Sequence, residues 1–205
     1  MKGLVDLATG GEGYVPHPGY RPALLGEKQL SLVGAAPQPG DVLGAEEFSI
    51  PPARNADVPL TSASLRRGLT LLSTLPNISR HACAAQILEL EEEATARLKD
   101  FRLVHVSADE PHFWQEVDHF HAGLRAQGYS LHGASVGSRE SFASAFGVAV
   151  RGHWRIAHGM FALLDGMFIG ADVPFQQLAV PDVHGFLLRV QRLLGRTPGC
   201  HRAGK

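Results

Sequence analysis

The chain has 205 residues, of which 44% are hydrophobic and 19% charged, enough for one domain with a substantial core. Its 19 Lys and Arg nearly balance its 20 Asp and Glu, and no block of like charge stands out. Nucleic acid and anionic membranes are therefore not expected as partners. No apolar run approaches the roughly 18 residues of a membrane span, and residues 1–14 lack the hydrophobic segment of a signal peptide. We expect a soluble, cytoplasmic protein.

Both ends of the chain are irregular and rich in Gly and Pro. We expect residues 1–24 to be a flexible N-terminal segment, residues 196–205 a flexible tail, and residues 25–195 the folded domain. At the start of that domain, residues 26–35 alternate weakly like a short strand, and a Pro/Gly turn over 35–43 leads toward a second one. A further short edge strand is expected at 58–60.

The middle of the chain predicts a strand, a helix and a second strand. Residues 69–75 are apolar on both faces, which is typical of a central strand covered on two sides. A helix begins near Cys83, and residues 101–107 form another β-rich run. Together they indicate a βαβ unit, so the sheet is at least partly parallel. The apolar stripe of the helix is Ile87, Leu90, Ala94 and Leu98.

Four more elements follow in chain order. Helical spacing predicts a helix over 113–127 and a shorter one over 138–146. Asp165-Gly166 lies between two apolar runs and predicts a β-hairpin, because a two-residue turn needs the positive φ angles that these residues tolerate. Pro181 opens a last helix. The inward faces predicted for the first and last of these helices are Phe113, Trp114, Val117, Phe120 and Leu124, and Val183, Phe186, Leu187, Val190 and Leu194.

Cys83, at the start of the first long helix, is the candidate reactive residue. The first-turn amide hydrogens of a helix have no partners and the helix dipole is positive there, so a thiolate is stabilised. Arg80 and His81, just upstream, add positive charge. The pKa of the thiol is therefore expected to fall below its usual value of about 8.5. The alternative is that Cys83 is a small buried hydrophobe.

The order of segments resembles the thiol peroxidases, a peroxiredoxin group of the atypical two-cysteine type with a thioredoxin-like fold. The matching stretches are Pro76 seven residues before Cys83, "CAAQILELEEEA", "VHVSADEPHF", "SRESFASAFGVAV", "FALLDGMFIGADV" and the N-terminal "EKQLSLVGAAPQPGD". The resemblance implies a mixed α/β sheet flanked by helices, with a small N-terminal hairpin. It also implies that Cys83 is the peroxidatic cysteine, that the substrate is a hydroperoxide, that thioredoxin or another thiol is the reductant, and that the protein is a homodimer.

Two active-site positions depart from the family pattern. A threonine stands three residues before the family's cysteine, where this chain has Arg80, which supplies charge and donors but no acceptor. The family's arginine just ahead of the late strand falls on Gly159, beside His158, when counted back from Asp165. Arg155, further upstream, is the candidate that replaces it, and the alternative is a solvent-exposed loop arginine.

The chain also lacks the cysteine that regenerates the family's enzymes. By the resemblance, this resolving cysteine maps to residues 117–120, and no cysteine is there. The second thiol, Cys200, is in the tail, where it either reaches Cys83 of a neighbouring subunit or is an incidental exposed thiol. A one-cysteine cycle, in which an external thiol resolves the sulfenic acid, is the simpler expectation.

Other chemistries find less support in the sequence. His112, His119 and His121 do not share one helix face, so no metal site is expected, and no motif predicts a cofactor. Two classes of function remain: a thiol-dependent peroxidase using Cys83, Arg80 and Arg155, or a catalytically degenerate relative that acts as a redox sensor or binds a partner.

Overall fold

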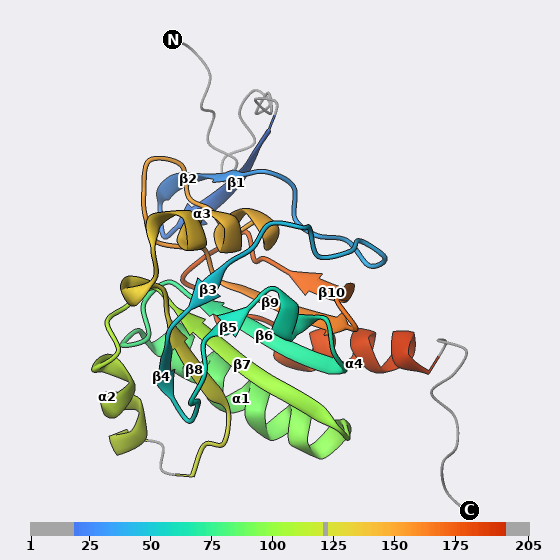
Figure 1. The fold of residues 1–205 in the computed structure, drawn as a ribbon. Helices are drawn as coiled ribbons and strands as arrows, with labels where there is room; N and C mark the ends of the chain where they lie inside the picture. Colours follow the sequence, from blue (N-terminus) through green and yellow to red (C-terminus); the bar gives the residue numbers. More distant parts are fainter. Residues whose placement is uncertain (1–18, 121–122, 196–205) are drawn as a thin grey trace, which may run out of the picture.

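The computed structural model describes residues 19–120 and 123–195, which form one mixed sheet with helices on both faces (Figure 1). The sheet has six strands in the order β10-β9-β6-β7-β8-β4. Strands β6, β7 and β8 are parallel, whereas β4, β9 and β10 run antiparallel to the strands beside them. The strands are β4 (Pro52–Arg54), β6 (Leu69–Leu75), β7 (Phe101–Ser107), β8 (Gln127–Ser130), β9 (Gly159–Leu164) and β10 (Met167–Asp172).

Strand β6 is the centre of the sheet, and all seven of its residues are buried. It pairs in parallel with β7, from Leu69 opposite Phe101 to Leu75 opposite Ser107, and antiparallel with β9 on its other side. Helix α1 (His81–Arg97) connects β6 to β7. This arrangement confirms the predicted βαβ unit. The central place of β6 follows from its sequence, because a run that is apolar on both faces is stable only where both faces are covered.

One face of the sheet is covered by α1 and α4 (Val183–Leu194), which lie below the sheet in Figure 1. Helix α4 begins at an N-cap, Asp182, whose side chain accepts a hydrogen bond from the Gly185 backbone N–H. Most of the predicted apolar stripes of both helices pack in one cluster with β6, β9 and β10, whereas Ile87 of α1 packs in a separate small cluster. Their buried residues are Leu90, Ala94, Val183, Phe186, Leu187 and Val190.

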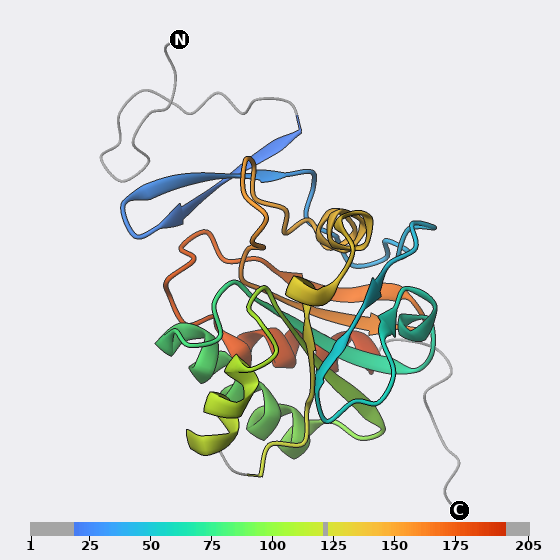
Figure 2. The same cartoon turned by 60° about the vertical axis from the view of Figure 1, so that its left-hand side comes forward.

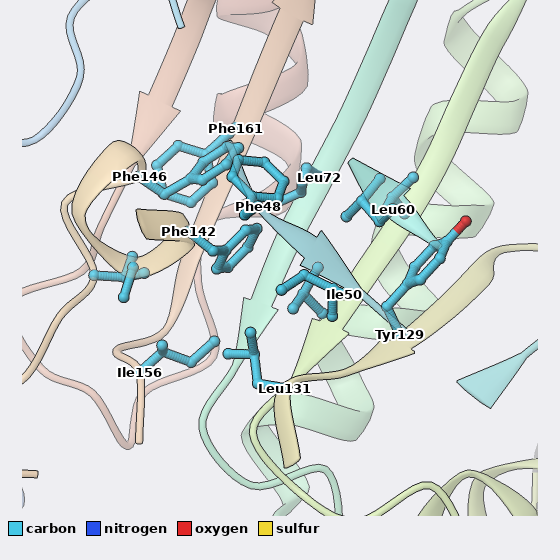
Figure 3. Packing of buried hydrophobic residues seen from close by; sticks show 14 of the residues in the cluster. Phe48, Ile50, Leu60, Leu72, Tyr129, Leu131, Phe142, Phe146, Ile156 and Phe161 are labelled. Atoms are coloured by element: carbon cyan, nitrogen blue, oxygen red, sulfur yellow. The ribbon is translucent and has the colours of Figure 1, made fainter. Parts of the chain in front are cut away.

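The opposite face carries an aromatic cluster (Figure 3). Phe142 lies in α3 (Val136–Ala145), and Phe146 follows it with ring centroids 4.8 Å apart. The Phe146 ring also meets Phe161 of β9 at 4.9 Å and Phe168 of β10 at 5.6 Å. The small sheet of β3 (Ser49–Ile50) and β5 (Leu60–Thr61) adds its buried side chains to this cluster.

The predicted hairpin near the C-terminus is β9 and β10. Its turn residues Asp165 and Gly166 both have positive φ, 51° and 83°. This is the backbone geometry of a two-residue turn that matches the twist of the strands. The Asp165 carboxylate also accepts the Gly68 backbone N–H at 2.8 Å, which ties the turn to the start of β6.

An N-terminal hairpin is present, but its partner strand differs from the prediction. Strand β2 (Lys28–Val33) pairs with β1 (Tyr20–Leu25), which precedes it, rather than with a strand after residue 43. The folded part therefore begins earlier than the predicted limit at residue 25. Figure 2 shows the hairpin on the α3 side of the sheet, where Ala149 accepts a backbone hydrogen bond from Val33. Residues 1–18 and 196–205 of the predicted flexible ends lie outside the described residues.

Helix α2 (Phe113–Phe120) is shorter than the predicted 113–127. Residues after it are held by other elements: the Glu91 carboxylate of α1 accepts the backbone N–H groups of Arg125 and Ala126, and the chain then enters β8. Trp114 and Val117 are buried as predicted, whereas Leu124 is only partly buried.

Short 3₁₀ turns occur at Ala63–Leu65 and Leu131–Gly133. Among the described residues, no helix has both the length and the apolar composition to cross a bilayer.

Candidate functional site

Cys83 is the third residue of α1, at the carboxyl end of the parallel strand β6. The loop between them turns at Asn77, whose side-chain oxygen accepts the Ser79 backbone N–H at 3.1 Å and whose carbonyl accepts the Arg80 backbone N–H at 3.1 Å. Arg80 is the N-cap residue of α1, and its side chain makes no capping hydrogen bond. Cys83 therefore occupies the predicted position in the first turn.

The Cys83 side chain is buried in a small apolar cluster rather than open to solvent. Its exposed fraction is 1%, and it packs with Leu75, Ile78, Ile87 and Trp114. This cluster fills the space between the end of β6, the first turns of α1, and α2. The sulfur is therefore out of reach of solvent and of any substrate in this conformation.

Burial raises the pKa of the Cys83 thiol to about 12, opposite in direction to the sequence-based expectation. Loss of hydration by the anion is the largest cause, and a backbone hydrogen bond from Asn77 opposes it. The negative charge of Asp109 raises the pKa further, and Arg80 lowers it. The prediction of a thiolate stabilised at neutral pH is wrong for this conformation, because it counted the helix terminus and Arg80 but not the apolar surroundings.

Asp109, which sequence reasoning did not single out, connects the loops around Cys83. It follows β7 and is 5% exposed. One carboxylate oxygen accepts the Ile78 backbone N–H at 2.6 Å, just before α1, and the other accepts Arg155 Nη1 at 2.6 Å. A signal for it was available: parallel strands β6 and β7 end at the same edge of the sheet, so the first polar residues after each are neighbours.

Arg155 reaches the loop before α1, and its role as the replacement arginine stays a prediction. It precedes β9, and its Nη1 donates to the Pro76 carbonyl at 2.5 Å and to Asp109. Its guanidinium also lies 5.0 Å from the centroid of the Trp154 ring. The alternative of a loop arginine directed to solvent is not what the structure has, since the side chain is about one-third exposed and ion-paired.

Gly159 and His158, where the gap-free count placed the family's arginine, have structural roles here. Gly159 begins β9 opposite Thr74, and its carbonyl accepts the Gln86 side-chain N–H at 3.1 Å. The His158 ring is fully buried, which lowers its pKa to about 4 and keeps it neutral at pH 7. Neither residue supplies a positive charge near Cys83.

Arg80, in contrast to Arg155, is exposed, and its side chain has no ion pair or hydrogen bond with a described residue. It lines an open pocket together with Pro76, Asn77 and Arg155. The N-terminal hairpin closes one side of this pocket through Leu25, Lys28 and Leu30. Cys83 is not among the lining residues, so the loop from Pro76 to Arg80 separates the sulfur from the pocket.

The remaining sequence-based expectations concern the resolving cysteine, Cys200 and a metal site. Val117 is buried within α2, and no cysteine occupies residues 117–120. Cys83 is the free cysteine of the described part of the chain, and Cys200 lies outside it. Within residues 19–120 and 123–195, no three His, Cys, Asp or Glu side chains gather as a metal site would require, and His121 lies outside these ranges.

Comparison of the sequence with protein-family models and with curated proteins gives no match. Comparison with solved structures finds "Thiol peroxidase from Chromobacterium violaceum" at TM-score 0.69 and 15% identity, covering 86% of this chain and 98% of that one. A peroxiredoxin-like protein from Aquifex aeolicus is similar at TM-score 0.68 and 16% identity, covering 84% and 97%. Peroxidoxin BcpB from Mycobacterium tuberculosis follows at 0.58 and 15%, covering 78% and 99%.

These similarities extend over nearly the whole of each solved chain and show the fold. The chain has the thioredoxin-like fold of the peroxiredoxins, with a mixed sheet, flanking helices and an N-terminal antiparallel hairpin. The predicted fold class is thereby confirmed. Identities of 15–16% carry no residue roles with them, so the activity rests on the site itself.

Proposed function

We propose that this protein is a thiol-dependent peroxidase in which Cys83 reduces hydrogen peroxide or an organic hydroperoxide. The observation that carries the proposal is the position of Cys83: it lies in the first turn of α1 after the central parallel strand, in a fold shared with thiol peroxidases. Asn77 donates a backbone hydrogen bond to the sulfur, and Arg80 lies one helical turn away.

The reaction requires the first turn of α1 to open, because the buried thiol has a pKa of about 12. At pH 7 such a thiol is ionised in roughly one molecule in 10⁵. Helix α1 is suited to opening at this end: its N-cap is an arginine without a capping hydrogen bond, whereas a good cap contributes about 1 kcal/mol. We propose that this opening moves the sulfur toward the pocket that Arg80 and Arg155 line.

In the opened state the Cys83 thiol first loses its proton to solvent. The thiolate then attacks the terminal peroxide oxygen and the O–O bond breaks, which gives Cys83 sulfenic acid, and the leaving alkoxide or hydroxide takes a proton from solvent. Thioredoxin or another thiol then forms a mixed disulfide with Cys83 and releases water, and a second thiol restores Cys83. Arg80 and Arg155 stabilise the thiolate and the leaving oxygen. The proposal needs no cofactor and no second cysteine of the chain.

The test is peroxide consumption by the purified protein with dithiothreitol or thioredoxin as reductant. We expect Cys83→Ser to abolish consumption and Cys200→Ser to leave it unchanged, since a one-cysteine cycle does not use the tail thiol. Equal rates for the wild type and Cys83→Ser would exclude the enzyme. Loss of activity in Cys200→Ser would instead replace the one-cysteine cycle by a two-cysteine one.

The buried sulfur also favours a second candidate, a redox sensor or partner-binding protein of the same fold. Its specific support is the ion pair between Asp109 and Arg155. Asp109 binds the Arg155 guanidinium, and its negative charge raises the pKa of Cys83. Dimedone labelling separates the two candidates: a sensor accumulates Cys83 sulfenic acid under peroxide without sustained turnover.

We propose a cytoplasmic homodimer whose catalytic unit is the predicted domain, residues 25–195, together with β1. Sedimentation of the purified protein at micromolar concentration tests the dimer. A monomer across that range removes the dimer from the proposal and leaves the chemistry of Cys83 intact.

A further inference from the structure

The pocket beside Arg80 has an apolar interior that the chemistry of Cys83 does not require. Its walls include Leu25 and Leu30 from the N-terminal hairpin, and Val150 and Ile156 from the segment before β9. The cavity holds about 140 Å³, below the roughly 300–1,000 Å³ of sites that enclose a whole ligand, so a bound molecule extends into its open mouth. This apolar part of the lining can remove an organic group from water.

The charged groups at this pocket are all basic. Lys28 of β2 and Arg80 line it, and none of the lining residues is Asp or Glu. The side chains of Lys28 and Arg80 are exposed and have no ion pair with a described residue. Arg155 also lines the pocket, but Asp109 neutralises it. Two uncompensated positive charges therefore face the same space.

Apolar walls and uncompensated cations together select the ligand. An inorganic anion gains nothing from Leu25 and Ile156, and a neutral apolar molecule gains nothing from Lys28 and Arg80. A molecule with one carboxylate and an alkyl body satisfies both, since its chain is removed from water while its charge stays at the rim.

We propose that this pocket is a binding site for an apolar organic carboxylate, of which decanoate is the simplest probe. The carboxylate lies between Lys28 and Arg80, and the alkyl chain lies against the hairpin and the segment before β9. In this conformation, with Cys83 buried, the site is separated from the sulfur by the loop from Pro76 to Arg80. It goes beyond the proposed peroxidase function and stands whether or not Cys83 turns over.

The test is isothermal titration calorimetry of the full chain with decanoate, decanol and acetate at low ionic strength. We expect saturable binding of decanoate, with decanol and acetate each at least tenfold weaker. Lys28→Glu is expected to weaken decanoate binding about tenfold, because it reverses one of the two charges. The matched control is Lys99→Glu, an exposed charge reversal in the α1–β7 turn away from the pocket, which should leave the affinity unchanged.

Raising the salt concentration to 0.5 M on the wild-type protein gives a measurement that needs no variant, and decanoate should then bind several-fold more weakly. Lys28→Gln serves in place of Lys28→Glu if circular dichroism shows that the latter is unfolded. The proposal is overturned by equal affinity for decanol and decanoate, by unchanged affinity in both Lys28 variants, or by the absence of saturable decanoate binding.

Discussion

Phe146 and Cys83 are both buried beside the central sheet, yet their surroundings differ in kind. Phe146 lies among other phenylalanine rings, on the face that α3 covers (Figure 3). Cys83 lies at the carboxyl end of β6, within a small cluster that is bordered by the ion pair of Asp109 and Arg155. The first region contributes packing alone, and the second combines packing with charge.

This difference separates stability from reactivity. Substitutions in the aromatic cluster should change the free energy of unfolding and leave the thiol as it is. Substitutions around Asp109 should also change the reactivity of the Cys83 thiol. The Asp109 carboxylate accepts a hydrogen bond from the loop before α1, and its negative charge raises the pKa of Cys83.

Phe146→Ala should have the largest effect on stability. The ring is fully buried and meets Phe48, Phe142, Phe161 and Phe168. Removing it leaves a cavity and is expected to lower the free energy of unfolding by about 3–5 kcal/mol in urea titrations. Phe175→Ala, at a side chain that is 43% exposed, is the control and should cost less than about 1 kcal/mol. A cost below about 1 kcal/mol for Phe146→Ala would contradict the assignment of this cluster as the core.

The second prediction concerns alkaline pH and follows from the Cys83 pKa of about 12. An unfolded cysteine loses its proton near pH 8.5, whereas the folded one keeps it up to about pH 12. Between these values the unfolded state binds fewer protons, so stability falls as pH rises, by about 1.4 kcal/mol per pH unit from this group.

Urea titrations at pH 8.5 and 10.5 measure this slope, with Cys200→Ser as the common background. The difference in stability between the Cys83 protein and its Cys83→Ser variant should fall by roughly 2–3 kcal/mol over these two pH units. The serine variant is the control for every other titrating group. A difference that does not change with pH would mean that the thiol is not buried as a neutral group.

The sequence predicted the parts of the fold whose cause is local. Strands 69–75 and 101–107 were predicted with their observed bounds, because each has apolar residues on both faces and is flanked by turn-forming or polar residues. The Asp165-Gly166 turn was predicted because its residues tolerate positive φ. The end of α2 was not, since Glu91, from a distant helix, binds the backbone at residues 125 and 126.

The same distinction holds for the candidate site. The helix start at Cys83 is local and was predicted, whereas the surroundings of the sulfur depend on Leu75, Ile87 and Trp114, which three different elements supply. The contact of Asp109 with Arg155 joins positions 46 residues apart. A charge pattern along the chain reports neither this pair nor the apolar surroundings of the sulfur, and burial in those surroundings is the main reason that the direction of the thiol pKa was predicted wrongly.

Asp109→Asn should change both the free energy of unfolding and the reactivity of the Cys83 thiol. The amide can still accept from the Ile78 N–H, but it removes the ion pair with Arg155, at an expected cost of about 1–3 kcal/mol. It also removes a negative charge that raises the Cys83 pKa, so iodoacetamide should modify Cys83 several-fold faster at pH 9. Asp172→Asn, which breaks the Arg189 ion pair on α4, is the matched control and should leave the modification rate unchanged. Equal rates in the two variants would remove Asp109 from the electrostatics of the thiol.

Arg80→Ala should have the smallest effect. Its side chain is exposed and makes no capping hydrogen bond, so the free energy of unfolding should change by less than about 0.5 kcal/mol. Its positive charge lowers the Cys83 pKa, so its loss should raise that pKa and slow iodoacetamide modification at pH 9. Arg192→Ala, at an exposed arginine near the end of α4, is the control for a general loss of positive charge. The modification rate is the decisive quantity: because Asp109 and Arg80 act on the sulfur with opposite signs, the two variants should move this rate in opposite directions. A change in the same direction for both would mean that loop opening, rather than charge, controls access to Cys83.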